Sequence, residues 1–230
     1  MNGNANDASG NGLHGTPANL TYGSGVIGQA GVFNGTSSRI VLPAGVNAAL
    51  DGKAAMTFCG RFKLGSTAAL LRMLFGLAYP PGSNKIGVGI SAARKLQVSA
   101  RSKATDSLQT VLSVDSFTDT TDWHHLAAVV NVGANTNLIY LDGSPVATTG
   151  TPSYGQATFA AGTYFETLGS SGAAYWWLGT IDDARMYDVE LPAWQIAALA
   201  ADRSGALCPW QCNNLIQPVF QQTIQPFIGV

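Results

Sequence analysis

Two apolar runs in the middle of the chain give its clearest structural signal. The first reads WHHLAAVV at residues 123–130, and the second reads LIYLDG at residues 138–143. Both runs have the content of β-strands, and the segment between them contains Gly and Asn, which favour turns. We therefore expect residues 123–132 and 138–142 to form two strands that pair with each other.

Another strand is predicted at residues 56–64, which read MTFCGRFKL. Successive side chains of a strand point to opposite faces, and apolar residues alternate in this run. One face would carry Met56, Phe58, Gly60, Phe62 and Leu64. This pattern is typical of a half-buried strand, with its second face toward water.

Strand-like runs continue on both sides. The dipeptide Asn34-Gly35 predicts the turn of a hairpin between residues 32–35 and 38–42. Further strands are expected at residues 70–77, 86–90, 96–101, 108–114, 164–169 and 176–187. Many short strands without helical patterns between them predict an all-β fold, a two-sheet antiparallel sandwich.

One short C-terminal helix is predicted at residues 192–201. Pro192 stands near its first position, and the segment is rich in Ala. Ile196, Leu199 and Ala200 would share one face of this helix.

The tail differs from everything before it. No charged residue follows Arg203, and prolines interrupt two similar segments at 216–220 and 224–228. We expect a domain at residues 1–202 and an extended apolar arm at residues 203–230. The side chains expected to contact a partner are Trp210, Ile216, Phe220, Ile224 and Phe227.

Four motifs resemble those of one family. The central runs resemble the W-H-H-x-A…x-x-Y-x-D-G hairpin of concanavalin A-like, laminin-G-like jelly-roll domains. Residues 7–15 (DASGNGLHG), 32–35 (VFNG) and 179–187 (GTIDDARMY) are similar to three further motifs, in the same order as in the family. The resemblance covers about residues 7–200 and implies a jelly-roll fold. The chain departs from the pattern at Trp194-Gln195, where the family usually has an acidic residue.

The resemblance also implies a structural Ca²⁺ ion between the opening loop and the closing strand. Asp7, Asn11 and Asp182 match the family positions, with Asp183 as an additional ligand. Carboxylate and amide oxygens are the donors that Ca²⁺ prefers. The alternative is that Asp7 and Asn11 only form turns, while backbone N–H groups hold Asp182.

Aromatic residues suggest a binding surface. Tyr175, Trp176 and Trp177 follow a loop of Gly and Ser at residues 169–172, and such rings can stack on sugars or fill an interface. The alternative is that one tryptophan lies in the core and the other covers the sheet edge.

The WHH motif has a structural interpretation. We expect Trp123 in the core, with His124 and His125 on opposite faces, because adjacent strand residues point apart.

Composition argues against several functions. The formal net charge is -1 and the 12 Lys and Arg are scattered, so nucleic acid is not expected as a ligand. No run is long and apolar enough for a membrane-spanning helix. Residues 1–7 contain no secretion signal. Cys59 is expected to be buried, and Cys208 and Cys212 could form a local disulfide.

Catalysis is not expected. Glycosidases use two carboxyl groups across the scissile bond. Glu166 and Glu190 are the only glutamates, and they lie in unrelated segments. Asp182 and Asp183 would point apart on a strand.

Two non-catalytic functions remain. The first is a structural subunit of a larger assembly, such as a phage capsid decoration or tail protein. It would be homo-oligomeric or bound to other virion proteins, assemble in the host cytoplasm, and use its arm for strand addition. The second is a carbohydrate- or protein-binding module at a cell surface or outside the cell.

Overall fold

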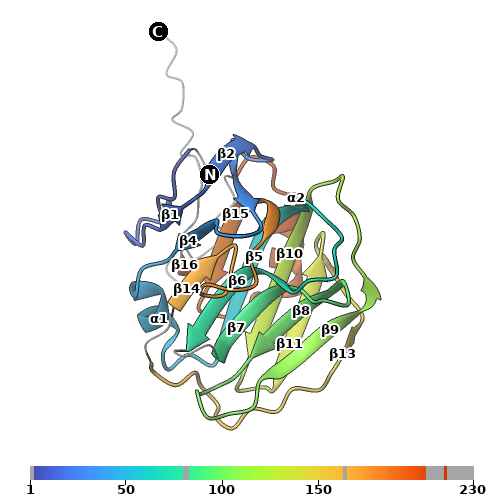
Figure 1. Cartoon of the computed structure of the whole chain (residues 1–230). Helices are drawn as coiled ribbons and strands as arrows, with labels where there is room; N and C mark the ends of the chain where they lie inside the picture. The colour runs from blue at the N-terminus through green and yellow to red at the C-terminus, as the bar shows by residue number, and fades with distance from the viewer. Residues whose placement is uncertain (1–2, 80–82, 163–164, 206–214, 217–230) are drawn as a thin grey trace.

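The computed structural model describes residues 3–79, 83–162, 165–205 and 215–216. They form two antiparallel sheets around a shared apolar core (Figure 1). The first sheet contains, in spatial order, β1 (Thr16–Ala18), β4 (Arg39–Val41), β14 (Phe165–Leu168), β6 (Arg72–Tyr79), β7 (Ser83–Ile90), β8 (Lys95–Ala100), β9 (Gln109–Ser116) and β13 (Thr148–Thr149).

The second sheet contains β12 (Ser144–Pro145), β11 (Thr136–Leu141), β10 (His124–Asn131), β5 (Ala55–Leu64), β15 (Leu178–Tyr187), β3 (Gln29–Asn34) and β2 (Thr21–Ser24). A short strand, β16 (Leu215–Ile216), pairs with β15. The predicted antiparallel jelly-roll sandwich is thereby confirmed.

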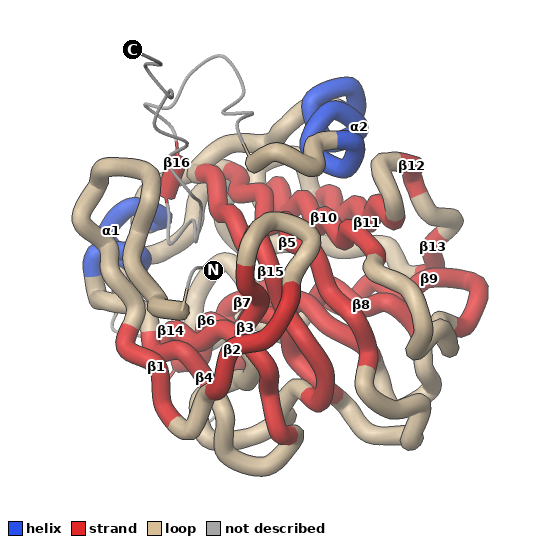
Figure 2. Tube along the Cα trace, turned by 90° about the horizontal axis from the view of Figure 1, so that it is seen from above, coloured by secondary structure: helices blue, strands red, loops and turns tan. Residues whose placement is uncertain are grey.

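Two helices lie on opposite sides of the sandwich, as the two views agree (Figures 1 and 2). The helix α2 (Ala193–Ala201) confirms the predicted C-terminal helix, and Pro192 is its N-cap residue. The other helix, α1 (Gly45–Leu50), was not expected from the sequence.

The two central strands pair with each other, as predicted. β10 pairs with β11 from Leu126–Leu141 to Asn131–Thr136. The Asp-Gly dipeptide of the motif turns the chain from β11 into β12, with φ of 51° at Asp142 and 84° at Gly143. Positive φ at both central residues characterises the tightest hairpin turns, which explains the residue types there.

The hairpin predicted at Asn34-Gly35 is wrong. β3 belongs to the second sheet and β4 to the first, so this segment passes between sheets. The side chain of Asn34 stabilises a loop in place of a tight hairpin turn. Its Oδ1 accepts hydrogen bonds from the N–H groups of Thr36, Ser37 and Ser38. This local capping holds the wider loop that the crossing needs.

β5 is buried on both faces, which the alternation did not predict. One face lies in the core between the sheets. On the other, Cys59 belongs to a second apolar cluster with Ala127 and Val129 of β10 and with Ile196 and Leu199 of α2. The apolar face of α2 therefore covers this part of the second sheet.

The predicted arm lies mostly outside the described residues, as do Trp210, Phe220, Ile224 and Phe227. Ile216 is placed in β16, opposite Met186 of the chain's own β15. Among the described residues, we find no helix with the length and hydropathy needed to cross a bilayer.

Candidate functional site

The segment between β14 and β15 forms a compact loop against the first sheet. Ser171 and Ala174 exchange two backbone hydrogen bonds of 2.9 and 3.1 Å, which makes a miniature hairpin. The hydroxyl of Thr167 donates to the carbonyl of Ser170 and accepts from the N–H of Gly172, at 2.9 and 3.2 Å. The loop is thus fixed to the end of β14.

Gly76 of β6 allows this close contact. A Cβ at position 76 would lie 2.6 Å from the carbonyl oxygen of Ser170 and 2.7 Å from Cα of Ser171. Any larger residue would push the loop away from the sheet.

Tyr175 is presented by this loop in an unusual backbone conformation. Its φ is 56°, which is uncommon for a residue with a bulky side chain. Its carbonyl accepts a 2.9 Å hydrogen bond from the N–H of Met73, which ties the loop to β6. The side chain is 45% exposed. An exposed aromatic ring on a strained backbone suggests a binding role.

Trp176 lies beside Tyr175 and contacts an arginine. The guanidinium carbon of Arg39 stands 5.6 Å from the centre of the Trp176 ring. Arg39 Nη1 also donates to the carbonyl of Gly172 at 3.2 Å. Both side chains are half-buried, so each keeps a surface in contact with solvent.

Trp177 lies in the core and does not reach the surface, in contrast to its expected contact with a ligand. It is fully buried and meets Phe62 edge to face, with ring centres 5.7 Å apart. A surface ligand could not reach it. The alternative interpretation, one tryptophan in the core and one at the surface, describes this arrangement.

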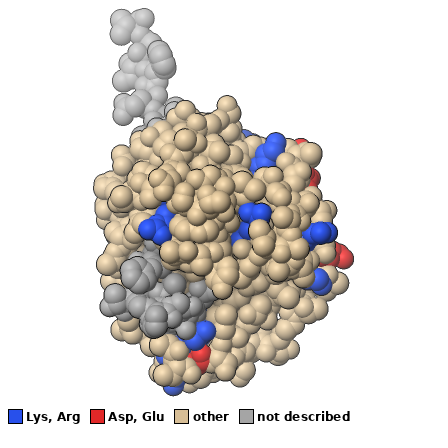
Figure 3. Space-filling model, viewed as in Figure 1, with Lys and Arg blue, Asp and Glu red and all other residues tan. Residues whose placement is uncertain are grey.

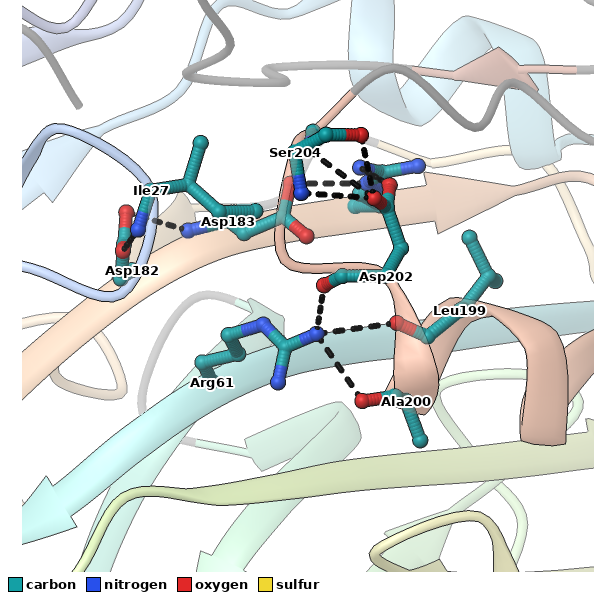
Figure 4. Close-up of polar contacts among 10 residues, drawn as sticks. Ile27, Arg61, Asp182, Asp183, Leu199, Ala200, Asp202 and Ser204 are labelled. Atoms are coloured by element: carbon teal, nitrogen blue, oxygen red, sulfur yellow. Dashed lines mark hydrogen bonds and ion pairs between the residues drawn. The ribbon is translucent and has the colours of Figure 1, made fainter.

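Asp182 and Asp183 lie at a bulge in β15, where the register with β5 shifts. Oδ2 of Asp182 accepts the N–H groups of Val26 and Ile27, both at 2.9 Å, and Oδ1 accepts the N–H of Asp183 (Figure 4). Backbone N–H groups therefore satisfy this carboxylate. The arrangement agrees with the alternative interpretation of Asp182, in which backbone donors and not a metal ion hold the side chain.

Asp183 belongs to a buried ionic cluster under α2. Its Oδ1 accepts a 2.8 Å hydrogen bond from Nε of Arg185, whose guanidinium also lies 3.7 Å from Asp202. Burial raises the pKa of Asp183, an effect that Arg185 opposes. Arg61 completes the cluster and donates to the last carbonyls of α2, at Leu199 and Ala200 (Figure 4). These contacts fasten the helix to the sheet.

The opening loop is stabilised from within. Asp7 accepts the N–H groups of Ser9 and Leu13 at 2.8 and 2.9 Å. Asn11 is exposed, and its N–H donates to the hydroxyl of Ser9.

The four residues do not form a cage for Ca²⁺. Both aspartates at the family positions, Asp7 and Asp182, already accept two or more N–H donors, and Asp183 pairs with Arg185. Among the described residues, no three His, Cys, Asp or Glu side chains meet in a metal-binding group. Calcium stays a prediction, which a thermal melt with and without a chelator tests.

The histidines of the WHH motif point to opposite faces, as expected. His124 packs against Phe62 and Phe117, and its Nδ1 lies 2.7 Å from Asp142. His125 is buried on the α2 side, where burial and then the charges of nearby arginines lower its pKa to about 3. Trp123 is half-buried just before β10, so its expected place in the core is wrong.

Comparisons with solved structures show similar folds at low identity. Domain 4 of AbnA, a GH43 extracellular arabinanase from Geobacillus stearothermophilus in complex with arabinotriose, has a TM-score of 0.60 and 20% identity, covering 86% of this chain and 93% of that one. The binding domain of Paraclostridial Mosquitocidal Protein 1 gives 0.63 and 12%, covering 85% and 48%. The CBM40 of Ruminococcus gnavus IT-sialidase, bound to α2,3-sialyllactose, gives 0.54 and 15%, covering 67% and 86%.

No curated protein matches the chain. A sequence profile of one family does match, and it spans residues 34–197, which is more than half of the chain and extends from the end of β3 into α2. The two-sheet sandwich and this match together show that the chain belongs to the concanavalin A-like lectin/glucanases superfamily.

Proposed function

We propose that this protein is a non-catalytic carbohydrate-binding module whose binding surface is formed by Tyr175, Trp176 and Arg39. The observation that carries the proposal is Tyr175, which is 45% exposed although its backbone is held in a left-handed conformation. A strained residue persists only where the surrounding structure fixes it, and such residues cluster at binding sites.

The chemistry of the surface suits a sugar. Aromatic rings supply an apolar face for the C–H side of a pyranose or furanose, at little cost in conformational entropy. Arg39 supplies donors for hydroxyl oxygens, and its contacts with Trp176 and Gly172 hold it in place before a ligand arrives. Pre-organisation of this kind favours affinity.

Two of the similar structures support this choice. The arabinanase domain was solved with arabinotriose and the CBM40 with sialyllactose. Both are similar to this chain in fold only, so they support the class of ligand and not a particular sugar.

The proposal that the module is non-catalytic rests on its carboxyl groups. Glycoside hydrolysis needs two of them facing one bond. Among the described side chains, Asp182 and Asp183 are buried and engaged, and Glu190 accepts a hydrogen bond from Asn131 at 2.7 Å. We therefore expect binding without turnover of any glycan.

Substitution of the surface aromatics tests the proposal. We expect Tyr175→Ala and Trp176→Ala each to weaken glycan binding on an array by about tenfold or more, because one stacked ring contributes on the order of 1–2 kcal/mol. Trp194→Ala is the matched control, since Trp194 is a 60% exposed tryptophan on α2. Equal binding by all three variants, or no binding by the native protein, would contradict the proposal.

An assembly subunit is the second candidate, and it includes the proposed virion location and protein partners. Its support is the uncharged segment after Arg203. Deletion of residues 217–230 tests it while keeping β16. The candidate fails if the shortened protein still oligomerises, or enters a particle, as the full chain does.

A further inference from the structure

Gly172 lies in the loop between β14 and β15, and three side chains hold its peptide groups. Its N–H donates to Oγ1 of Thr167 at 3.2 Å. Its carbonyl accepts hydrogen bonds from Oγ of Ser170 at 3.0 Å and from Nη1 of Arg39 at 3.2 Å. The φ of Gly172 is 59°, in the left-handed region that glycine enters without strain. The conformation of this one residue therefore sets the direction of its carbonyl.

The carbonyl of Gly172 orients Arg39. Within the described part of the chain, Nε of Arg39 has no hydrogen-bond partner. The contacts that direct its guanidinium are this carbonyl and the ring of Trp176, whose centre is 5.6 Å from the guanidinium carbon. Lys and Arg in the middle of the face seen in Figure 3 likewise stand among uncharged residues. A shift of the Gly172 peptide would therefore move Arg39 relative to Trp176.

Thr167 fixes this peptide from inside the protein. It is only 2% exposed, and it stands opposite Val41 of β4 and Gly76 of β6. Its hydroxyl donates to the carbonyl of Ser170 at 2.9 Å and accepts the N–H of Gly172. One buried hydroxyl therefore satisfies two backbone groups of the loop, and a ligand at the surface does not touch it.

We propose that Thr167 is a positioning residue of the binding surface: through Gly172, its buried hydroxyl holds Arg39 against Trp176 before a ligand arrives. This inference rests on the proposed carbohydrate-binding function. A loop that is already ordered in the free protein loses little further conformational entropy on binding, which favours affinity. Thr167 thus contributes to binding although it contacts no ligand.

Thr167→Val tests the role of the hydroxyl, because valine keeps the branched shape of the side chain and removes both hydrogen bonds. The probe is the glycan that the native protein binds most tightly on an array of arabino- and sialyl-oligosaccharides. We expect affinity for this glycan to fall by about three- to tenfold, as the net loss of one hydrogen bond implies. Thr167→Ser keeps the hydroxyl and should bind as the native protein does. Weak binding by Thr167→Ser would overturn the role of the hydroxyl.

Thr57 provides a matched control in the second sheet. It is fully buried, and its Oγ1 donates to the carbonyl of Val189 at 2.8 Å and accepts the N–H of Leu191 at 2.9 Å. Both threonines thus bridge a carbonyl and the N–H two residues later. We expect Thr57→Val to lower the melting temperature as Thr167→Val does, but to leave glycan affinity unchanged. Equal losses of affinity in the two variants would reflect general stability and overturn the inference.

A second measurement needs no ligand. The ring of Trp176 should shift the NMR resonances of the Arg39 side chain, because the guanidinium lies beside the ring. We expect this shift to shrink in Thr167→Val, since the Gly172 carbonyl no longer holds its direction, and to persist in Thr57→Val. An unchanged shift in Thr167→Val would overturn the route through Arg39.

The outcomes separate this inference from the proposed function. Glycan binding that is lost in Trp176→Ala but unchanged in Thr167→Val overturns the inference and leaves the carbohydrate-binding function standing. No binding of any glycan by the native protein overturns both. If Thr167→Val does not fold, Thr167→Ala removes the same hydroxyl from a smaller side chain, and native affinity in that variant overturns the inference.

Discussion

Nε of Arg185 lies 2.8 Å from Oδ1 of Asp183, two residues earlier on the same strand, and both side chains are almost fully buried. On a regular strand, residues two apart share a face but are about 6–7 Å apart along the chain. The bulge after Asp182 and the φ of 46° at Asp183 allow this short contact. The pair then meets Asp202, at the end of α2.

Loss of this pair should destabilise the fold. We expect Asp183→Asn to lower the free energy of unfolding by about 3–5 kcal/mol, because the buried charge of Arg185 would lose its shortest ion pair and rely on the longer contact with Asp202, at 3.7 Å. Urea denaturation measures the change. Lys53→Gln is the control: Lys53 pairs with Asp188 but is 46% exposed, so its loss should cost less than about 1 kcal/mol. Similar effects of the two substitutions would contradict this.

Acid should destabilise the protein through His125. Its pKa is about 3 when folded and near 6.5 when unfolded, so the unfolded chain binds the extra proton between these values. Stability is thus complete above pH 6.5 and falls by about 1.4 kcal/mol per pH unit toward pH 3.

Comparison with His125→Gln isolates this effect. We expect the native protein to lose more stability than the variant between pH 7 and 4.5, as measured by urea unfolding at each pH. The expectation fails if the two pH profiles run parallel.

Cys59 should be inert in the folded state. It is buried under α2, and burial raises its pKa to about 12, so almost no thiolate is present at neutral pH. With Cys208 and Cys212 replaced by Ser, we expect no reaction with a thiol reagent in native buffer and complete reaction in denaturant. In the same background, Ser144→Cys places an exposed thiol on β12 that should react at once. Rapid reaction of Cys59 would mean that α2 opens readily.

Gly76→Ala should disturb the loop that carries Tyr175. The new Cβ would lie 2.6 Å from the carbonyl of Ser170, so loop or strand must move. We expect a loss of about 1–3 kcal/mol in stability, together with weaker glycan binding. In the control Gly23→Ala, the nearest atom is a methyl of Val32 at 3.3 Å. Unchanged binding in Gly76→Ala would show that the position of the loop is not critical.

Local patterns in the sequence predicted much of the fold. Alternation placed β5, because the period of a strand depends on neighbouring residues alone. Asn34-Gly35 was misread for a related reason. The same dipeptide starts a hairpin or a wider loop, and the hydroxyl and N–H groups at residues 36–38 select the loop.

The site was less predictable. Tyr175 and Trp176 were proposed as binding residues from residue type and the Gly-Ser loop before them, and this stays a prediction. Nothing local distinguishes them from Trp177, whose burial depends on Phe62, more than a hundred residues earlier. Arg39 was missed because its role depends on the residues that surround it in space. Only the folded chain brings Arg39 to the aromatic loop, where it contacts Gly172 and Trp176.

The pairing of β16 has a consequence for oligomerisation. β3 pairs with β15 only from Leu178 to Ile181, and β16 pairs with it at Met186 and Tyr187. Without β16, the backbone N–H and C=O groups of this part of β15 would form an open edge, which can accept a strand from another molecule. A strand from another molecule can pair with this part of β15 only after Leu215 and Ile216 have been displaced. Intramolecular pairing of β16 and pairing with a second molecule therefore exclude each other.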